Sequence, residues 1–336
     1  MVCNPPGDVN TKPNPLTKNN RSTKRPSRES TSIAGAKQAA TSGLANLRSR
    51  LQTEGISERA AQIITSGRTT GTYNNYESAW KIFSSWCEQR QVDPVLCPLK
   101  YILDYLTEMM DTKNREYRTI NNHRSAISAF HSEVDGHKVG KHPRVQELLK
   151  GISYCKPPKP RLNAVWDVEI LINHIEQQPH NNELSLKELT LKTTALLALT
   201  AIPRVSELAM LDTQWLIKKE DVYTFQLEGR AKHSKQGKPT PPIIFTKFTP
   251  NSKLCPLRTI DTYLEKTETL RIGVEGRSKL FLCYIKPYGP ATKASIRRWL
   301  LEAMSTAGID TQVYKAHSTR SSASSKAKSR GGFLWR

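Results

Sequence analysis

Large apolar side chains between residues 57 and 153 recur every three or four positions, the spacing of one helical face. Further runs begin after Pro98 and cover residues 120–134 and 145–152. The clearest run is Tyr76, Trp80, Phe83 and Cys87. We expect four amphipathic helices in a small bundle, with the aromatic stripe buried in its core rather than exposed as a platform for stacking bases.

After residue 162 the pattern mixes helical periods with short alternating runs. Pro203 interrupts the chain, and a new helix is expected to begin at Arg204 with Glu207 in its first turn. Alternating segments typical of β-strands flank a lysine-rich turn. The expected helices are 167–177, 186–200, 257–271 and 291–307, and the expected strands are 221–226 and 242–245. The fold class is therefore mainly α, with an α+β second domain that contains a small antiparallel sheet.

The segments outside these patterns set the domain boundaries. Residues 1–55 are rich in Ser, Thr, Asn, Pro and basic residues, so we expect a disordered basic arm, either solvated or in contact with phosphates or an import receptor. Residues 154–161 hold three prolines and three basic residues, which favours an extended linker. The predicted domains are a helical domain over 56–153 and a second domain over 162–336.

The charge of the chain limits its partners. Its 51 Lys and Arg residues outnumber 30 Asp and Glu residues, and the resulting net charge of +21 favours nucleic acid or an anionic surface. No stretch approaches the ~18 apolar residues of a membrane span, and the first residues lack an apolar signal core. We expect a nuclear or cytoplasmic protein that is not secreted and has no membrane partner. The six cysteines are scattered without the spacing of zinc ligands, so no metal is expected.

The third expected helix carries a group of polar side chains on the face opposite its apolar stripe. Hydrogen-bond donors of this kind suit phosphates and base edges, although a solvated polar face has the same composition. The candidate DNA-binding residues are Arg118, Asn122, His123 and Arg124.

Three short motifs in the second domain carry the candidate chemistry. They are Arg204 and Glu207 in R-x-x-E-L, a turn with lysines at 232, 235 and 238, and His317 and Arg320 in H-x-x-R. Two guanidinium groups can hold the non-bridging oxygens of one phosphodiester through charge-assisted hydrogen bonds. On a helix, residues 317 and 320 would project to the same face, so the histidine could contact that phosphate or exchange a proton.

In this order the motifs resemble the catalytic set of the tyrosine recombinases, or phage integrases, and most closely the branch carried by DIRS-type retrotransposons and Cryptons. The first domain is similar to their SAM-like core-binding domain. The resemblance implies duplex DNA as the partner, no cofactor, and recombination or integration of DNA as the activity, and it leaves open a homo-oligomer on the DNA. The implied catalytic residues are Arg204, Lys232, His317 and Arg320. Lys232 would protonate the departing 5′ oxygen, with Lys235 and Lys238 as alternatives.

The sequence departs from that family at one position. The family's nucleophilic tyrosine follows the second arginine, and none of residues 321–336 is a tyrosine. We therefore expect a C-terminally truncated recombinase of mobile-element origin that binds DNA but does not cleave it. The alternative is a non-enzymatic protein that binds DNA through the same phosphate-holding residues and that its host retains for this binding.

Overall fold

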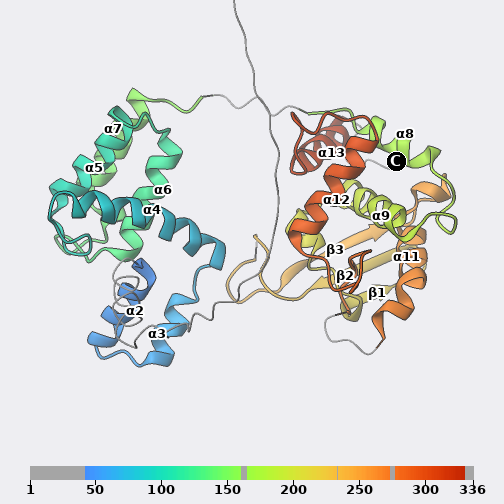
Figure 1. Ribbon diagram of the computed structural model, residues 1–336, viewed down its shortest axis with the longest axis horizontal. Coiled ribbons are helices and arrows are strands. Elements are labelled where there is room, and N and C mark those ends of the chain that lie inside the picture. Colours follow the sequence, from blue (N-terminus) through green and yellow to red (C-terminus); the bar gives the residue numbers. More distant parts are fainter. Residues whose placement is uncertain (1–41, 160–164, 233, 273–276, 330–336) are drawn as a thin grey trace, which may run out of the picture. The chain divides into compact units, whose positions relative to one another are not determined.

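The computed structural model divides the chain into two compact units, Met1–Pro160 and Arg161–Arg336, and each is described by itself (Figure 1). The residues that the structure describes are 42–159, 165–232, 234–272 and 277–329. The first part of the predicted arm, residues 160 and 161 of the predicted linker, residues 162–164 and the last residues of the chain lie outside this description.

The first unit contains the four helices that the apolar spacing predicts. They are α4 (Thr70–Glu88), α5 (Leu99–Asp111), α6 (Tyr117–Phe130) and α7 (Pro143–Cys155), with a short 3-10 turn η1 (Val139–Lys141) before α7. Trp80 and Phe83 of α4 and Phe130 of α6 are fully buried, and the rings of Trp80 and Phe130 meet edge to face at 5.5 Å. The prediction of a core aromatic stripe is therefore confirmed.

Two helices before the bundle were not expected. They are α2 (Gly43–Thr53) and α3 (Glu58–Thr65), so the prediction that disorder extends to residue 55 is wrong for residues 42–55. The Glu77 carboxylate of α4 accepts hydrogen bonds from the backbone N–H groups of Gly43 (3.2 Å) and Leu44 (2.6 Å). Nη1 of Arg50 donates to the backbone oxygen of Phe130 at 3.4 Å. Contacts with the bundle, which a local pattern does not reveal, stabilise α2.

Gly43 allows this close approach of α2 to the bundle. A Cβ atom at this position would lie 2.3 Å from a ring carbon of Phe130. We expect Gly43→Ala to lower the free energy of unfolding by about 1 to 2 kcal/mol, measured by urea denaturation. Gly71→Ala in α4 is the matched control, because nothing lies within 4 Å of the added Cβ. The control should leave stability unchanged or raise it by about 0.5 kcal/mol, and an equal loss in both variants would contradict the packing argument.

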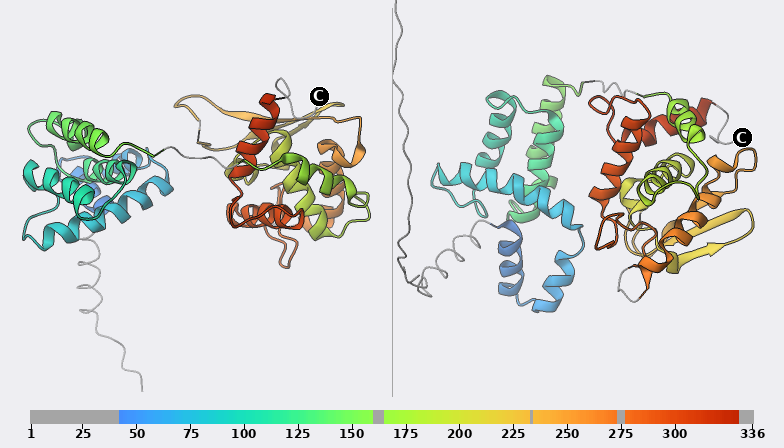
Figure 2. Two further views of the ribbon diagram at one scale, coloured as in Figure 1. Left: turned by 90° about the horizontal axis from the view of Figure 1, so that it is seen from above. Right: turned by 45° about the vertical axis from the view of Figure 1, so that its right-hand side comes forward.

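The second unit is built around α9 (Leu186–Thr200), a helix with almost every side chain from Leu189 to Leu199 buried. Its other helices are α8 (Val168–Gln177), α10 (Val205–Leu208), α11 (Pro256–Arg271), α12 (Lys293–Thr306) and α13 (Ser318–Ser329). Both views of Figure 2 show α9 (Leu186–Thr200) in the middle of the unit, in contact with α11 and α12. The helix boundaries agree closely with the sequence prediction because Ser185 and Pro203 mark the two ends of α9.

A three-stranded antiparallel sheet completes the second unit. Its strands β1 (Leu216–Lys218), β2 (Val222–Leu227) and β3 (Thr240–Thr246) lie in the order β1-β2-β3. Tyr223 pairs with Phe245, and the alternate side chains of β2 face the core. The two predicted strands are confirmed, as is the mainly α fold class with a small antiparallel sheet. Of the helices that the structure describes, none combines the length and apolar composition needed to span a membrane.

Candidate phosphate-binding site

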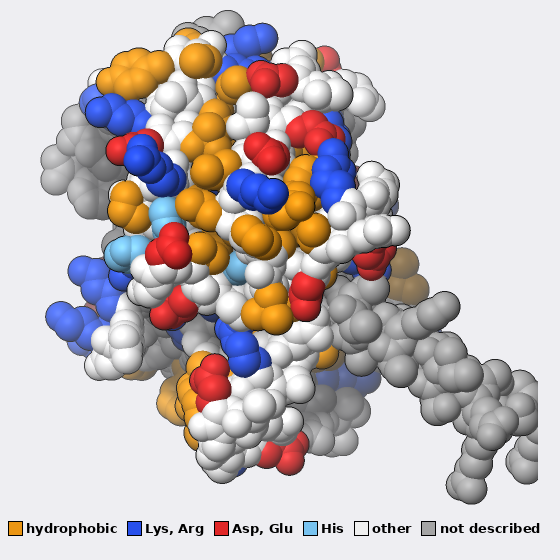
Figure 3. Space-filling view, turned by 90° about the vertical axis from the view of Figure 1, so that its left-hand side faces the viewer, with side chains coloured by type: hydrophobic (Ala, Val, Ile, Leu, Met, Phe, Trp, Pro, Cys, Tyr) orange, Lys and Arg blue, Asp and Glu red, His pale blue; other side chains and the backbone are white. Residues whose placement is uncertain are grey.

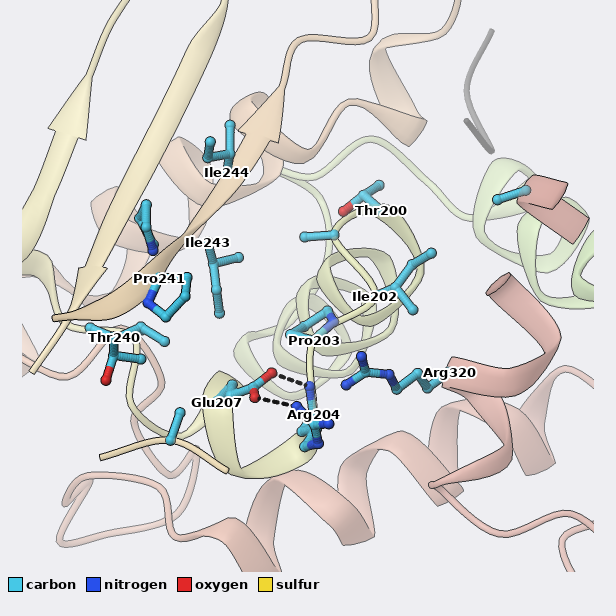
Figure 4. A pocket seen from close by; sticks show the side chains of 15 residues that line it. Thr200, Ile202, Pro203, Arg204, Glu207, Thr240, Pro241, Ile243, Ile244 and Arg320 are labelled. Carbon is cyan, nitrogen blue, oxygen red and sulfur yellow. Dashed lines mark hydrogen bonds and ion pairs between the residues drawn. The ribbon is translucent and has the colours of Figure 1, made fainter. Parts of the chain in front are cut away.

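A pocket of about 490 Å³ lies in the second unit where α9 ends (Figure 4). Side chains from the turn after α9, from α10, from the β2–β3 hairpin and from α13 enclose it. Its polar members are Thr200, Arg204, Glu207, Thr240 and Arg320, and most of the others are apolar side chains of the turn and the hairpin. The pocket therefore brings together the two arginines that the sequence motifs singled out.

Arg204 is positioned by the first turn of α10. Its backbone N–H and its Nη1 atom each donate to the Glu207 carboxylate, at 2.8 Å in both cases. The arginine and glutamate side chains are largely buried, with exposed fractions of 19% and 13%. Glu207 therefore holds its own helix start and the guanidinium in place.

The turn that delivers Arg204 has an unusual backbone. Ile202 has φ of +51°, in the left-handed region that β-branched residues rarely adopt. Such a conformation costs on the order of 1–2 kcal/mol and persists only where the surroundings enforce it. The ring of Pro203 then fixes its own φ angle directly before Arg204. The chain thus turns sharply between α9 and α10, directly at the pocket.

Arg320 reaches the same pocket from the first turn of α13. The backbone N–H of Trp166 donates to Ser322 Oγ at 3.0 Å, and its indole N–H donates to Ser318 Oγ at 3.0 Å, which anchors this helix. Figure 4 shows the Arg320 side chain extending toward Arg204. Among the described residues, its buried Nη1 atom has no hydrogen-bond partner. A buried cationic donor without an acceptor is rare in native proteins and suits an anionic ligand.

The candidate lysines lie beside this pocket rather than in its wall. Lys232 follows Ala231, which lines the pocket, and its side chain is exposed, as are those of Lys235 and Lys238. The base of the turn is ordered, because the N–H of Ala231 donates to Ser234 Oγ at 2.8 Å. The assignment of the family lysine to Lys232 stays a prediction.

His317 is not on the helix that carries Arg320. The expectation that a helix projects both side chains to one face is wrong, because α13 begins at Ser318 and His317 lies in the preceding turn. A hydrogen bond from the Ser318 N–H to the Lys315 oxygen, at 2.7 Å, closes that turn. The His317 side chain is exposed and does not line the pocket.

In the first unit, the expectation that His123 lies on an exposed face is wrong. Its side chain is 6% exposed, and its Nδ1 atom lies 2.7 Å from the hydroxyl of Tyr105. Burial, assisted by the charges of Lys113 and Arg115, lowers the pKa of His123 to about 4. The sequence held a signal for this position, since residue 123 follows Ile120 by three places and therefore shares its buried stripe.

The other candidate residues of α6 remain accessible. Arg118 is exposed and Asn122 is half-buried. Arg124 is half-buried, and its Nε and Nη2 atoms donate to Asn121 Oδ1 at 3.1 and 2.5 Å. Arg124 and Asn121 line a groove with residues of α7 that the sequence reading did not single out. Those on α7 are Gln146, Leu149, Lys150, Ser153 and Tyr154.

Charge is mixed on the face that Figure 3 shows. In the view of Figure 3, acidic side chains lie between the basic ones, with hydrophobic side chains among both. A polyanion meets compensating negative charge on such a surface. Arg124 and Lys150 make the groove on α6 and α7 a candidate for a nucleic-acid contact of the first unit.

Comparisons with known proteins bear on the fold. No protein-family model and no curated protein matches the chain. A fragment of the Tn1549 transposon integrase, solved in complex with transposon right end DNA, matches with a TM-score of 0.51 and 13% identity over 86% of this chain and 87% of that one. Two others are the XerH recombinase bound to palindromic difH substrate and a lambda integrase dimer bound to a COC′ core site. The XerH structure has a TM-score of 0.48 and 14% identity over 77% of this chain and 69% of that one. The lambda integrase structure has a TM-score of 0.43 and 16% identity over 81% of this chain and 84% of that one.

The Tn1549 match carries the fold assignment. The chain has the fold of the Tn1549 integrase, with a helical unit followed by a unit of helices around a small sheet. At this level of identity the similarity extends to the fold alone.

Proposed function

We propose that this chain binds duplex DNA as a tyrosine recombinase does and holds one backbone phosphate between Arg204 and Arg320. The observation that carries the proposal is the convergence of both guanidinium groups on one pocket, with Nη1 of Arg320 buried and without a hydrogen-bond partner among the described residues. A phosphodiester supplies two non-bridging oxygens, which are the acceptors that such a site lacks.

The two arginines differ in their hydrogen-bond partners, and they would therefore contribute differently to binding the phosphate. Arg204 is fixed by Glu207 at 2.8 Å, so its position is set before a ligand arrives. Arg320 has a spare buried donor that a phosphate oxygen would engage. In a family reaction both would stabilise the charge that develops on the phosphorus oxygens in the transition state. Lys232 and His317 would approach the phosphate from the exposed turns beside the pocket, as proton donor and hydrogen-bond donor respectively.

The first unit would bind the duplex at positions other than the phosphate that Arg204 and Arg320 hold. Arg118, Asn122 and Arg124 of α6 offer donors to phosphates or base edges, and Lys150 of α7 adds charge to the groove that Arg124 lines. His123 does not take part, because its side chain is buried. The net charge of +21 favours the same partner over neutral surfaces.

The proposal for these 336 residues is confined to binding the DNA and positioning a phosphate. None of residues 321–336 is a tyrosine, so the family's nucleophile is not supplied by the positions that follow Arg320 in this sequence. We also propose a mobile-element origin and a nuclear location, on the order of the motifs and their resemblance to DIRS-type and Crypton recombinases.

The clamp can be tested with Arg320→Gln in a duplex-binding assay at low salt. The substitution removes a buried, unpaired donor, so the fold should persist. We expect affinity for duplex DNA to fall by about tenfold, the loss of one charge-assisted contact. Fluorescence anisotropy measures the affinity, and circular dichroism checks the fold.

Arg258→Gln is the matched control. It removes the same charge from an exposed position on α11, outside the arginine pocket. The control should bind nearly as well as the unaltered chain. An equal loss in both variants would mean that overall charge, not the clamp, drives binding. A chain that fails to bind duplex DNA even at low salt would refute the proposed function itself.

A further inference from the structure

Lys192 is a buried lysine in the middle of α9. Its side chain is 1% exposed, and among the described residues its Nζ atom has no hydrogen-bond partner. Lysine is almost never fully buried in proteins unless its charge is paired. The neighbours on α9, Thr193 and Thr194, donate their hydroxyls to backbone oxygens of the preceding turn, at 2.6 and 2.8 Å. Lys192 has no equivalent acceptor, so its burial needs another explanation.

Lys192 lines a pocket of about 230 Å³ inside the second unit. Most of the wall is apolar, and His174, Gln178, Glu188 and Thr306 add polar groups. The apolar members include Leu171, Ile175, Leu184, Leu191, Ala195 and Ala303. The Oε1 atom of Gln178 is also buried without a hydrogen-bond partner among the described residues. This pocket is distinct from the arginine pocket, which contacts α9 only at Thr200.

The buried charge of Lys192 favours an anion, and the carboxylate that lines the same pocket, on the exposed residue Glu188, already accepts hydrogen bonds from Ser185. Burial, together with the charge of nearby Lys253, lowers the pKa of Lys192 to about 8, so most molecules still carry the ammonium at neutral pH. A buried ammonium without a counter-ion is unfavourable, and a bound carboxylate would relieve that cost. An apolar cavity of ~150 Å³ already accommodates benzene, so this pocket has room for a ring or a short chain.

We propose that this pocket binds a small monocarboxylate with an apolar body. The carboxylate would accept a hydrogen bond from Nζ of Lys192, and the apolar body would replace water against Leu171, Leu191 and Ala303. This site would be separate from the phosphate clamp and does not depend on the proposed function. Its ligand differs from DNA in size as well as in the apolar surface that it must bury.

Benzoate and its neutral analogue benzyl alcohol are suitable probes, titrated into the full chain by calorimetry or ligand-observed NMR. We expect benzoate to bind at least about tenfold more tightly than benzyl alcohol, because only benzoate pairs with the ammonium. Equal binding of the two would overturn the proposal in favour of a merely apolar cavity. Undetectable binding of benzoate at about 10 mM would overturn it in favour of a site filled by water alone.

Two variants separate the proposed contact from general attraction to a basic protein. Lys192→Met keeps the length of the side chain and should lose at least about tenfold in affinity for benzoate. Lys187→Met removes the same charge from an exposed position on α9, where Nζ lies 2.6 Å from Glu302, and should bind benzoate normally. Equal effects in the two variants would overturn the proposal. Should Lys192→Met fail to fold, the comparison of benzoate with benzyl alcohol on the unaltered chain still decides the matter.

Discussion

The affinity of this chain for duplex DNA should fall about 10³-fold between about 50 and 200 mM monovalent salt, if about six phosphates are neutralised. Each neutralised phosphate releases counterions, so added salt reverses the main driving force. The physical basis is the net charge of +21 and the exposure of basic residues such as Arg118 and the three lysines of the β2–β3 turn. Anisotropy titrations at several salt concentrations give the slope directly.

A pair of double variants tests where that charge acts. Lys235→Gln with Lys238→Gln removes two charges from the exposed turn beside the arginine pocket and should reduce the logarithmic slope by about 2. Lys218→Gln with Lys247→Gln makes the same change in net charge at lysines that lie 2.6 and 2.9 Å from Asp261 and Asp221. The second pair should leave the slope almost unchanged. Similar slopes in the two double variants, or binding that ignores salt, would show that the turn does not contact the DNA.

Elements with local signals were predictable from the sequence. Pro203 predicts both the end of α9 and a new helix at Arg204, and α10 begins one residue later, at Val205, with Arg204 as its N-cap. The two longer strands follow from their alternating residues and from the turn between them. β1 has only three residues, too few for a period to appear, and it owes its conformation to pairing with β2.

Elements held by distant contacts were not predictable. The helix α2 depends on Glu77, more than thirty positions away, and on the absence of a Cβ at Gly43. The chemistry of Arg204 and Arg320 predicted that they hold one phosphate. Their separation could not be predicted, because it is set by the packing of α10 and α13 on α9. The positive φ of Ile202 has no sequence signal either, since isoleucine seldom adopts it.

The predicted positions of His123 and His317 were wrong for opposite reasons. His123 was placed by its chemistry on a polar face, although its spacing from Ile120 and Ile127 puts it on the buried stripe of α6. His317 was placed by its spacing from Arg320, but the helix begins one residue later than that argument needs. Helix ends are decided by capping and local turns, which the spacing of two residues does not specify.

The stability of the first unit should fall as the pH is lowered from 7 to 5, because His123 is buried in its neutral form. Its pKa is about 4 in the folded chain, against 6.5 for a free histidine. Between these values the unfolded chain binds a proton that the folded chain does not, so the stabilisation is present above about pH 6.5 and is lost as the pH falls. The full difference corresponds to about 3 kcal/mol, of which about 2 kcal/mol is lost by pH 5. Hydrogen exchange of α6, corrected for the intrinsic rate, reports this change locally.

His123→Gln removes the titration while keeping a polar group that can bond the Tyr105 hydroxyl, 2.7 Å from His123. The variant should therefore lose about 2 kcal/mol less than the unaltered chain over the same pH range. His137→Gln makes the same chemical change at an exposed histidine of the same unit and should leave the pH dependence intact. If the unaltered chain and His123→Gln lost the same stability between pH 7 and 5, another group would cause the pH dependence. His123 would then have to be charged or accessible in the folded state. That result would return His123 to the set of residues able to face DNA, because an imidazolium must reach solvent or an anion to be stable.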